Sequence, residues 1–353
     1  MQTLTVSTQN GKYDVCIGSG LLAACGGHIA AVHAPCCAVI VSDDRVNALY
    51  GDVCERSLCE AGFSCLRFVF PHGEQSKNFD AYLRLQAFLA ENRVTRADLI
   101  VALGGGVVGD LAGFAAATYL RGIAYVQLPT TLLAMVDSSV GGKTAVDLPQ
   151  GKNLCGCFWQ PSLVLCDTDA LATLPADVFA DGMAEVIKYA LLGDAALFET
   201  LQREDALSQL QQIICRCVQM KRDIVAADTF DRGERQKLNL GHTVGHAIEK
   251  CSGYAVSHGC AVAMGLAAMS RAAARLGFAA HSLPQQTAQL LGQYSLPTAC
   301  PYSAEMLFEA ACSDKKVQRS RVTLVVPTGI GSCELVSVPL QEMAAWLEAG
   351  AAQ

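Results

Sequence analysis

Three histidines lie within seventeen residues in the C-terminal third of a chain that has only seven. His242 and His246 are four positions apart in the stretch 239–249, and His258 follows. Helical side chains at positions i and i+4 share a face, so both imidazoles of the first pair can point toward one centre. Imidazole is the commonest metal ligand and carries protons near neutral pH. The spacing therefore indicates metal binding, proton transfer or both.

A catalytic divalent ion needs at least three converging protein donors. His242 and His258 supply two candidate nitrogens, and Glu185 is the candidate for a third donor. Glu185 lies in an apolar helical stretch, where a carboxylate is costly to bury unless it is paired or bound to a metal. A simpler alternative is that Lys188, three positions later, is its salt-bridge partner.

His246 stays ambiguous between ligand and proton carrier. Zinc peptidases also carry two histidines four positions apart, but a glutamate that acts as the base directly follows the first one. Thr243 occupies that position here. The peptidase interpretation therefore has no base and is excluded.

A glycine-rich loop at 104–110 fits the pattern G-x-G-x-x-G between a predicted strand at 98–103 and a predicted helix at 111–120. Such a loop lets backbone amides approach a pyrophosphate, although glycine-rich turns also serve packing alone. No acid lies between Asp110 and Asp137 to hold a ribose, but Asp44 ends an earlier predicted strand. A variant nucleotide-binding fold is therefore favoured over the ordinary Rossmann arrangement.

Basic and polar residues recur near these motifs. Two polar loops, at 73–77 and 129–132, follow predicted strands, although each is also compatible with an ordinary capped helix start. Lys143 and Lys152 are placed in glycine-rich loops, a context that suits close contact with an oxyanion. Others lie in helical or polar contexts: Lys221, Arg235, Lys315 and Lys316. A phosphate or carboxylate ligand is expected.

The apolar patterning predicts the elements that must position these groups. Strands are expected at 37–44, 65–70, 98–103, 123–129 and 163–167, alternating with helices such as 79–92. This alternation is typical of an α/β fold with a mainly parallel sheet. Helical periodicity then dominates at 179–192, 206–227, 243–251, 259–276 and 340–349, with one strand at 321–327. We therefore predict a Rossmann-like nucleotide-binding domain (1–170) and a mostly α-helical metal-binding domain (171–353).

The overall composition excludes several classes of protein. A net charge of −7 without a basic stripe argues against nucleic-acid binding. The 17 cysteines are scattered, form no C-x-x-C pair and follow an N-terminus without a signal-like segment, which favours reduced thiols and a cytoplasmic location. The long uncharged stretches 15–42 and 276–304 are broken by polar and turn-forming residues, so no membrane span is predicted.

Together these pieces resemble the 3-dehydroquinate synthase family, whose members act at the second step of the shikimate pathway. The matching motifs occur in the family's order along nearly the whole chain. They are the segments 73–77, 104–110, 128–134, 136–143, 151–154, 184–188 and 239–249. The last is the most specific on its own.

The resemblance implies a homodimer that binds NAD, a zinc or cobalt ion and a phosphorylated sugar acid, 3-deoxy-D-arabino-heptulosonate 7-phosphate. The implied metal ligands are Glu185, His242 and His258. The implied NAD-binding residues are Asp44, Glu74, Lys77, Gly106, Val107, Val108, Gly109, Asp110, Thr130, Thr131, Lys143, Lys152, Thr173 and Leu174. The implied substrate-binding residues are Asp137, Lys143, Lys152, Asn153, Lys188, Lys221, Arg235, Asn239, His246 and either Lys315 or Lys316. Arg121 is implied to reach a phosphate across the dimer interface.

The implied reaction is a transient oxidation at C5 with NAD as hydride acceptor, β-elimination of phosphate, re-reduction, ring opening and aldol closure. It assigns proton transfer at or near C5 to His246, with Asn239 and Lys152 as orienting donors; the leaving phosphate is an alternative acceptor for the C6 proton. The family usually reads His-Gly-Glu from the third ligand, whereas Cys260 stands in place of that glutamate here. We interpret the replaced acid as a partner of a metal ligand.

Three other functions are compatible with parts of the pattern. Another sugar-phosphate cyclase, such as 2-deoxy-scyllo-inosose synthase, would share the NAD, metal and loop motifs. A metal-dependent glycerol or alcohol dehydrogenase would not need the group of Lys152, Lys188 and Arg235. A binding protein without catalysis is disfavoured by the complete donor set.

Overall fold

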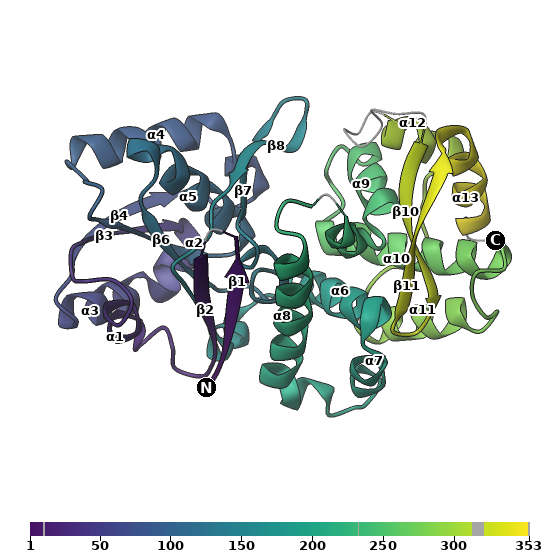
Figure 1. Cartoon of the computed structure of the whole chain (residues 1–353), viewed down its shortest axis with the longest axis horizontal. Coiled ribbons are helices and arrows are strands. Elements are labelled where there is room, and N and C mark those ends of the chain that lie inside the picture. Colours follow the sequence, from purple (N-terminus) through teal and green to yellow (C-terminus); the bar gives the residue numbers. More distant parts are fainter. Residues whose placement is uncertain (10, 232, 313–320, 352–353) are drawn as a thin grey trace. The chain divides into compact units, whose positions relative to one another are not determined.

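The computed structural model describes residues 1–9, 11–231, 233–312 and 321–351. Its internal contacts divide the chain into two compact units. The first holds Met1–Leu174 and Lys221–Phe230, and the second holds Pro175–Met220 and Asp231–Gln353. Figure 1 shows a sheet-centred first part in purple to blue and a helix-rich later part in green to yellow.

The described part of the first unit is built on a seven-stranded sheet in the order β1-β2-β9-β6-β5-β3-β4. Its strands are β1 (Gln2–Thr8), β2 (Gly11–Gly18), β3 (Cys37–Asp43), β4 (Ser64–Phe70), β5 (Leu99–Gly104), β6 (Ala124–Pro129) and β9 (Leu163–Asp167). All neighbouring pairs are parallel except β1 with β2. Every residue of the inner strand β5 is buried, as its continuous apolar run requires between two helical layers.

Helices of the first unit cover this sheet. They are α1 (Cys25–Ala30), α2 (Asp44–Val46), α3 (Asp52–Glu60), α4 (Phe79–Glu91) and α5 (Gly106–Thr118), with short turns at Asn47–Gly51, Glu74–Ser76, Tyr119–Arg121, Ala134–Ser138 and Thr168–Thr173. Leu85 and Leu89 of α4 and Leu111 and Ala115 of α5 pack in one apolar cluster with the sheet. A separate antiparallel pair, β7 (Lys143–Leu148) and β8 (Gly151–Phe158), contacts α5.

The strand order reverses beside β3. The chain runs from β3 outward to β4 and then returns to β5 on the other side of β3. Open α/β sheets bind ligands at such a point, outside the carboxyl ends of the strands. Asp44 follows β3 and the glycine loop follows β5, so two predicted nucleotide-binding motifs end neighbouring strands.

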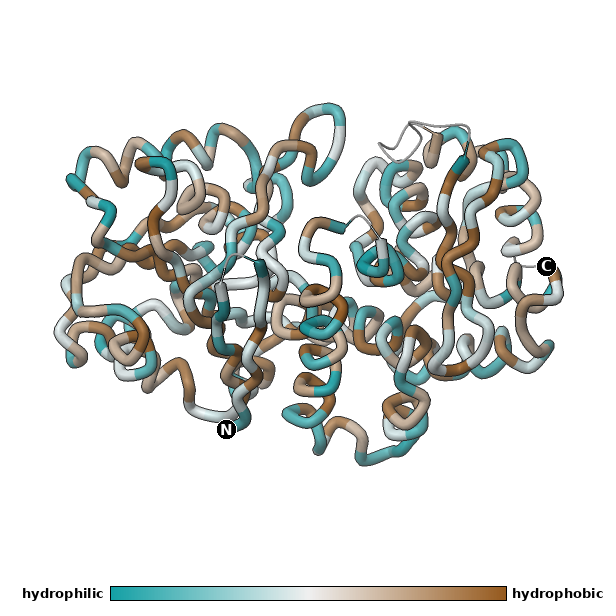
Figure 2. Tube along the Cα trace, in the orientation of Figure 1, coloured by the Kyte–Doolittle hydropathy of each residue, from teal (hydrophilic) through white to brown (hydrophobic). Residues whose placement is uncertain are grey.

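The second unit is mainly helical. Its helices are α6 (Ala176–Gly193), α7 (Ala195–Leu201), the first part of α8 (Leu210–Ala227), α9 (His242–Cys251), α10 (His258–Arg275), α11 (Leu283–Gln293), α12 (Ala304–Cys312) and α13 (Met343–Gly350). Short turns occupy Ala206–Gln209, Glu234–Asn239 and Leu340–Glu342, and β10 (Arg321–Gly329) pairs with β11 (Ser332–Pro339). Figure 2 shows brown hydrophobic stretches along β10 and β11 and alternating teal and brown around α8.

The predicted fold class is confirmed, with local corrections. Lys143, Lys152 and Asn153, placed in glycine-rich loops by sequence, belong to the β7–β8 hairpin. Helix α5 starts at Gly106 and not at 111, because the glycine loop itself forms the first turn. The strands β1, β2 and β11 were not predicted. Among the described residues, no helix combines the length and apolarity needed to cross a membrane.

Candidate functional site

Helix α6 carries the acidic donor of the second unit. Glu185 is completely buried, and its Oε2 lies 2.5 Å from Nζ of Lys188, which is also buried. The predicted alternative partner is therefore present. This ion pair does not use the full acceptor capacity of the carboxylate, since neither oxygen accepts a hydrogen bond of regular geometry from the described residues.

Close packing of α9 on α10 brings the histidines to this carboxylate. Gly241 precedes α9 in the left-handed conformation, with φ of 78°, so the chain can turn sharply into His242. A Cβ on Gly265 of α10 would lie 2.0 Å from the carbonyl oxygen of Gly241, and one on Gly245 would lie 3.2 Å from backbone atoms of Ala261. Glycine is thus required for the close approach of these two helices.

The start of α10 is held by α6. Asp181 of α6 accepts hydrogen bonds from Oγ of Ser257 at 2.6 Å and from the amide of Cys260 at 3.1 Å. A Cβ on Gly259 would lie 2.3 Å from the carbonyl oxygen of Asp181. Position 260 is in the first turn of α10, where a glutamate is also able to cap the helix. Our interpretation of that acid as a partner of a metal ligand stays a prediction, since the backbone contact of Cys260 does not determine where a glutamate side chain would lie.

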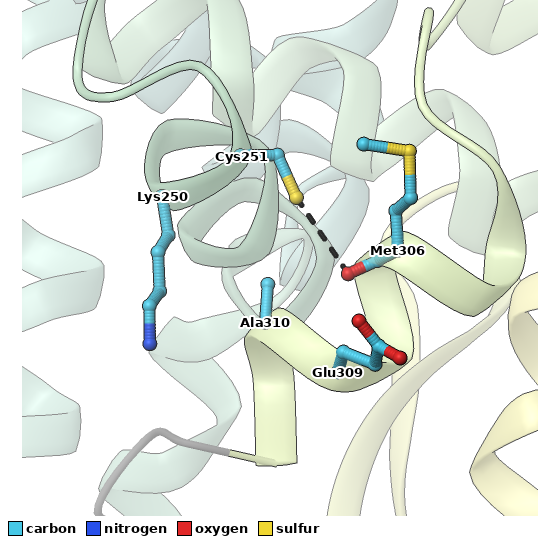
Figure 3. A pocket seen from close by; sticks show the side chains of 5 residues that line it. All are labelled: Lys250, Cys251, Met306, Glu309 and Ala310. Carbon is cyan, nitrogen blue, oxygen red and sulfur yellow. Dashed lines mark hydrogen bonds between the residues drawn. The ribbon is translucent and has the colours of Figure 1, made fainter.

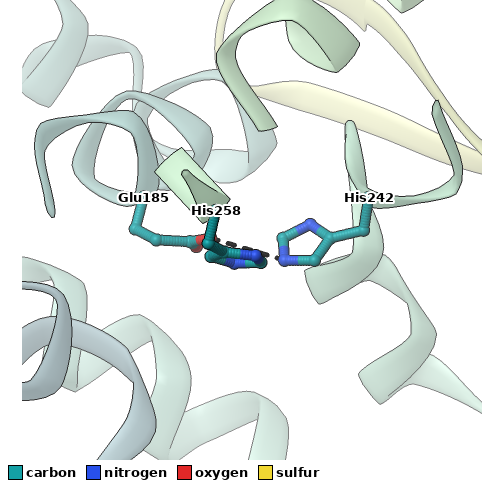
Figure 4. Close-up of side chains that lie close together, drawn as sticks. All are labelled: Glu185, His242 and His258. Atoms are coloured by element: carbon teal, nitrogen blue, oxygen red, sulfur yellow. Dashed lines mark ion pairs between the residues drawn. The ribbon is translucent and has the colours of Figure 1, made fainter. Parts of the chain in front are cut away.

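Glu185, His242 and His258 converge on one point (Figure 4). Oε1 of Glu185 lies 3.4 Å from Nε2 of His242 and 3.3 Å from Nε2 of His258. One ligand atom from each of the three residues lies within 4.8 Å of the others. A carboxylate and two imidazoles on a buried, compact point suit a divalent ion that keeps further positions open.

The protonation of this cluster reflects its charges. Burial lowers the pKa of His242 to about 4 against the attraction of Glu185. Burial also opposes the charged form of His258, but contacts with Glu185 and Glu249 outweigh it and raise the pKa of His258 to about 10. Burial opposes ionisation of Glu185 as well, yet the charge of Lys188 and the two histidines lower the pKa of that carboxyl well below its usual value.

His246 adjoins the cluster without joining the group of three. Its ring centroid lies 5.4 Å from that of His242 and 6.3 Å from that of His258. It belongs to a second group with Glu249 and His258. Sequence reasoning missed the buried Glu249; its signal was an acid three positions after His246, on the same helical face.

In the first unit, the glycine loop opens α5 with backbone amides. Gly105 is the N-cap and supplies no side-chain hydrogen bond to them, so the first amides of α5 are available to an anion. Thr130, after β6, is buried, and its Oγ1 has no hydrogen-bond partner among the described residues. A Cβ on Gly105 would lie 3.0 Å from Thr131. These features fit a dinucleotide.

Lys77 is buried beside this loop among three carboxylates. Its Nζ lies 2.7 Å from Glu74, 3.3 Å from Asp110 and 3.8 Å from Asp147. Burial raises the pKa of Asp110 to about 6. Asp147, which sequence reasoning missed, also accepts the amide of Asn153 at 2.8 Å and so fixes the β7–β8 hairpin.

Other predicted residues of the first unit have identifiable partners. Lys221 donates to Oδ1 of Asp137 at 2.9 Å. Oδ1 of Asp44 accepts from the amide of His72 at 3.0 Å and lies 2.8 Å from its Nδ1. Thr173, in the turn before Leu174, contacts the hydroxyl of Tyr50 at 2.6 Å.

The remaining predicted residues are placed individually. Arg121 is exposed, with φ of 68°, in a turn of the first unit. Arg235 is buried and Asn239 donates to the carbonyl of Gln236 in the turn before α9. Lys315 and Lys316 lie outside the described residues.

A separate hollow of about 330 Å³ lies beside α9 and α12 (Figure 3). It is lined by Lys250, Cys251, Met306, Glu309 and Ala310, and the thiol of Cys251 donates to the carbonyl of Met306 at 3.6 Å. It contains none of the predicted site residues.

Known proteins resemble the chain over nearly its whole length. The sequence profile described as 3-dehydroquinate synthase N-terminal matches residues 67–181, and that described as 3-dehydroquinate synthase C-terminal matches 182–317. The 3-dehydroquinate synthase of Streptococcus suis (strain 05ZYH33) is 42% identical over 352 residues, which cover 98% of this chain and 99% of that protein. The chain belongs to the 3-dehydroquinate synthase family. The resemblance stated from its motifs is therefore confirmed.

Further similarities agree with membership of the 3-dehydroquinate synthase family. The family member from Caulobacter vibrioides (strain NA1000 / CB15N) is 46% identical over 346 residues, or 94% of each chain. A solved structure of 2-epi-5-epi-valiolone synthase from Streptomyces hygroscopicus subsp. jinggangensis 5008, with NAD⁺ and Zn²⁺ bound, has a TM-score of 0.86 and 27% identity. That comparison covers 99% of this chain and 98% of the other.

Proposed function

We propose that the chain catalyses the 3-dehydroquinate synthase reaction. It converts 3-deoxy-D-arabino-heptulosonate 7-phosphate into 3-dehydroquinate and phosphate, which makes it a phosphate-eliminating lyase of the shikimate pathway. The observation that carries this proposal is the convergence of Glu185, His242 and His258 in a chain that belongs to this family. We also propose that the protein is a homodimer and that it is located in the cytoplasm.

The donor set of the second unit fits a divalent metal ion. Both oxygens of Glu185 are buried and accept no regular hydrogen bond from the part of the chain that the structure describes, and Nε2 of each histidine faces Oε1. We assign Glu185, His242 and His258 as ligands of zinc or cobalt. When bound, the ion would act as a Lewis acid toward a substrate oxygen.

The carboxyl end of the sheet in the first unit fits NAD. The amides that open α5 would hold the pyrophosphate. The buried hydroxyl of Thr130 would donate a hydrogen bond to the dinucleotide or accept one from it. Asp44 would accept a hydrogen bond from a ribose hydroxyl. When bound, NAD would accept a hydride from C5 and later return it, and so would not be consumed.

His246 is the proposed proton carrier at the C5 hydroxyl. Its ring is half-buried and lies next to both proposed ligand histidines. Imidazole exchanges a proton near neutral pH, and Asn239 and Lys152 would orient the substrate for that transfer. Lys188 would neutralise Glu185 and is also one of the proposed substrate contacts.

Cationic side chains are proposed to hold the carboxylate and phosphate of the substrate. These are Lys143, Lys152, Lys188, Lys221, Arg235, one lysine of the pair Lys315 and Lys316, and Arg121 from the partner subunit, with Asp137 and Asn153 as polar contacts. Their charges would stabilise the phosphate as it leaves C7. In this role they distinguish the site from that of a simple alcohol dehydrogenase.

Phosphate release from the heptulosonate phosphate tests the proposal. We expect release that requires both NAD and the metal, stops with a chelator and resumes on addition of Zn²⁺ or Co²⁺. NADH should not accumulate. Turnover of glucose 6-phosphate in place of the heptulosonate would instead identify an inosose synthase. Steady NADH formation from glycerol would identify a dehydrogenase.

A further inference from the structure

The two proposed ligand histidines face different acceptors behind the metal-binding nitrogen. Nδ1 of His242 lies 3.1 Å from the carbonyl oxygen of Leu240. Nδ1 of His258 lies 3.6 Å from Oε2 of Glu249. One ring therefore has a neutral backbone acceptor behind it, and the other has a carboxylate.

These acceptors determine which nitrogen carries the proton. A carbonyl oxygen and a carboxylate can only accept, so Nδ1 of His242 is the donor to Leu240. Nδ1 of His258 is the ring nitrogen that faces Glu249, at ion-pair distance, and is therefore the one that can donate to it. A neutral imidazole then has its lone pair on Nε2, and both Nε2 atoms face Oε1 of Glu185. An acceptor that faces Nδ1 thus keeps the lone pair of the same ring on Nε2, the nitrogen that faces Glu185.

Glu249 is well placed to hold this arrangement. It is only 3% exposed and lies on α9, whose packing against α10 is fixed by the contact of Gly245 with Ala261. A buried carboxylate is costly unless a positive or hydrogen-bonding group faces it. His258, on the first residue of α10, is such a group.

Glu249 could instead be a metal ligand itself, together with His246 and His258. That set would use Nδ1 of His258 and leave the buried Glu185 and His242 without an ion. The set with Glu185 uses two Nε2 atoms whose opposite nitrogens both have acceptors. The geometry favours Glu249 behind the ligand.

We propose that Glu249 is a positioning residue that accepts the Nδ1 proton of His258 and orients its Nε2 toward the metal. This inference rests on the proposed function, because it assumes that His258 binds the ion. A carboxylate in this role makes the imidazole a stronger donor and fixes its ring. Glu249 would therefore act on metal affinity without contacting the substrate.

The test measures metal affinity of the full-length protein for Co²⁺ and Zn²⁺ by competition with a chromophoric chelator. Glu249→Ala should weaken binding by about 10–100-fold, the usual effect of losing such a partner. Glu249→Gln, whose amide oxygen can still accept from Nδ1, should lose less. The visible spectrum of the cobalt protein should change in the same order. At saturating metal, KM for the heptulosonate phosphate should stay within about twofold of the wild-type value.

Glu309→Gln is the matched control, since it removes the same charge from an exposed position of α12. It should leave affinity and spectrum unchanged. Wild-type affinity in both Glu249 variants would overturn the inference, even if urea unfolding showed that they are less stable. If the wild-type protein itself bound neither ion, the proposed function would fail instead.

Discussion

His242 and His246 share a face of α9 but are predicted to have different roles. His242 is buried and its Nε2 faces Glu185, whereas His246 is half-buried and outside that group of three. His246→Gln should therefore keep the metal and lose about 10²–10⁴-fold in turnover, the usual contribution of a general acid–base group. His242→Gln should lose both. Metal analysis and phosphate release on the same samples check this, and metal loss in the His246 variant would contradict it.

Residue types and spacing were sufficient to predict the convergence of three donors. Glu185 was conspicuous because it interrupts an apolar run, and the histidines because they are few. Glu249 was not, because an acid near the end of an amphipathic helix is usually solvated. Cys260 is a further case: its adjacency to His258 in sequence suggested a role near the metal, and the structure shows only that its backbone amide donates to Asp181.

At the scale of elements, the α9–α10 crossing depends on a missing side chain. Gly265→Ala would place a Cβ 2.0 Å from the carbonyl oxygen of Gly241. We expect a loss of about 1–3 kcal/mol in the free energy of unfolding, as is typical for overpacking, together with weaker metal binding. Gly292→Ala in α11 is the control, since nothing lies within 4 Å of its Cβ position. It should be neutral or stabilising by up to about 1 kcal/mol. Urea unfolding distinguishes the two.

The amino end of α5 predicts a pH dependence of NAD binding. Burial raises the pKa of Asp110 to about 6, so this carboxyl is neutral below that pH and negative above it. Since the dinucleotide pyrophosphate is also negative, the dissociation constant for NAD should rise as pH increases through about 6. Asp110→Asn should flatten this dependence. Calorimetric titration at several pH values measures it, and an equally steep profile in the variant would contradict the assignment.

The long elements were predictable and the hairpins were not. Continuous apolar runs marked β3, β5 and β9, because both faces of a central parallel strand are buried. The β7–β8 hairpin escaped because glycines and lysines dominate its sequence, and its position depends on long-range contacts with α5 and Lys77. Lys143 and Lys152, two of the lysines predicted to bind substrate, lie on that hairpin. The element that supports them was therefore missed, and their role stays a prediction.

At the scale of the whole molecule, the proposed homodimer predicts complementation. Arg121 is proposed to act in the active site of the partner subunit, and His246 in that of its own. Arg121→Ala and His246→Gln should each be nearly inactive alone. Mixed after reversible dissociation, they should regain roughly a quarter of wild-type activity, since half of the dimers are hybrids with one intact site. No recovery in hybrids verified by mass spectrometry would show that Arg121 does not act across the interface.

The first unit is assembled from two separate stretches of the chain, since Lys221–Phe230 returns to it after the second unit has begun. A gene fragment that ends at residue 174 would encode the entire seven-stranded sheet, yet it would lack the lysine that pairs with Asp137. The complementary fragment would carry the second half of α8 without the unit that it joins. Dissection at the apparent boundary should therefore separate Asp137 from Lys221, two of the proposed substrate contacts. Circular permutation, which preserves every segment, is the better route to separating the folding of the two units.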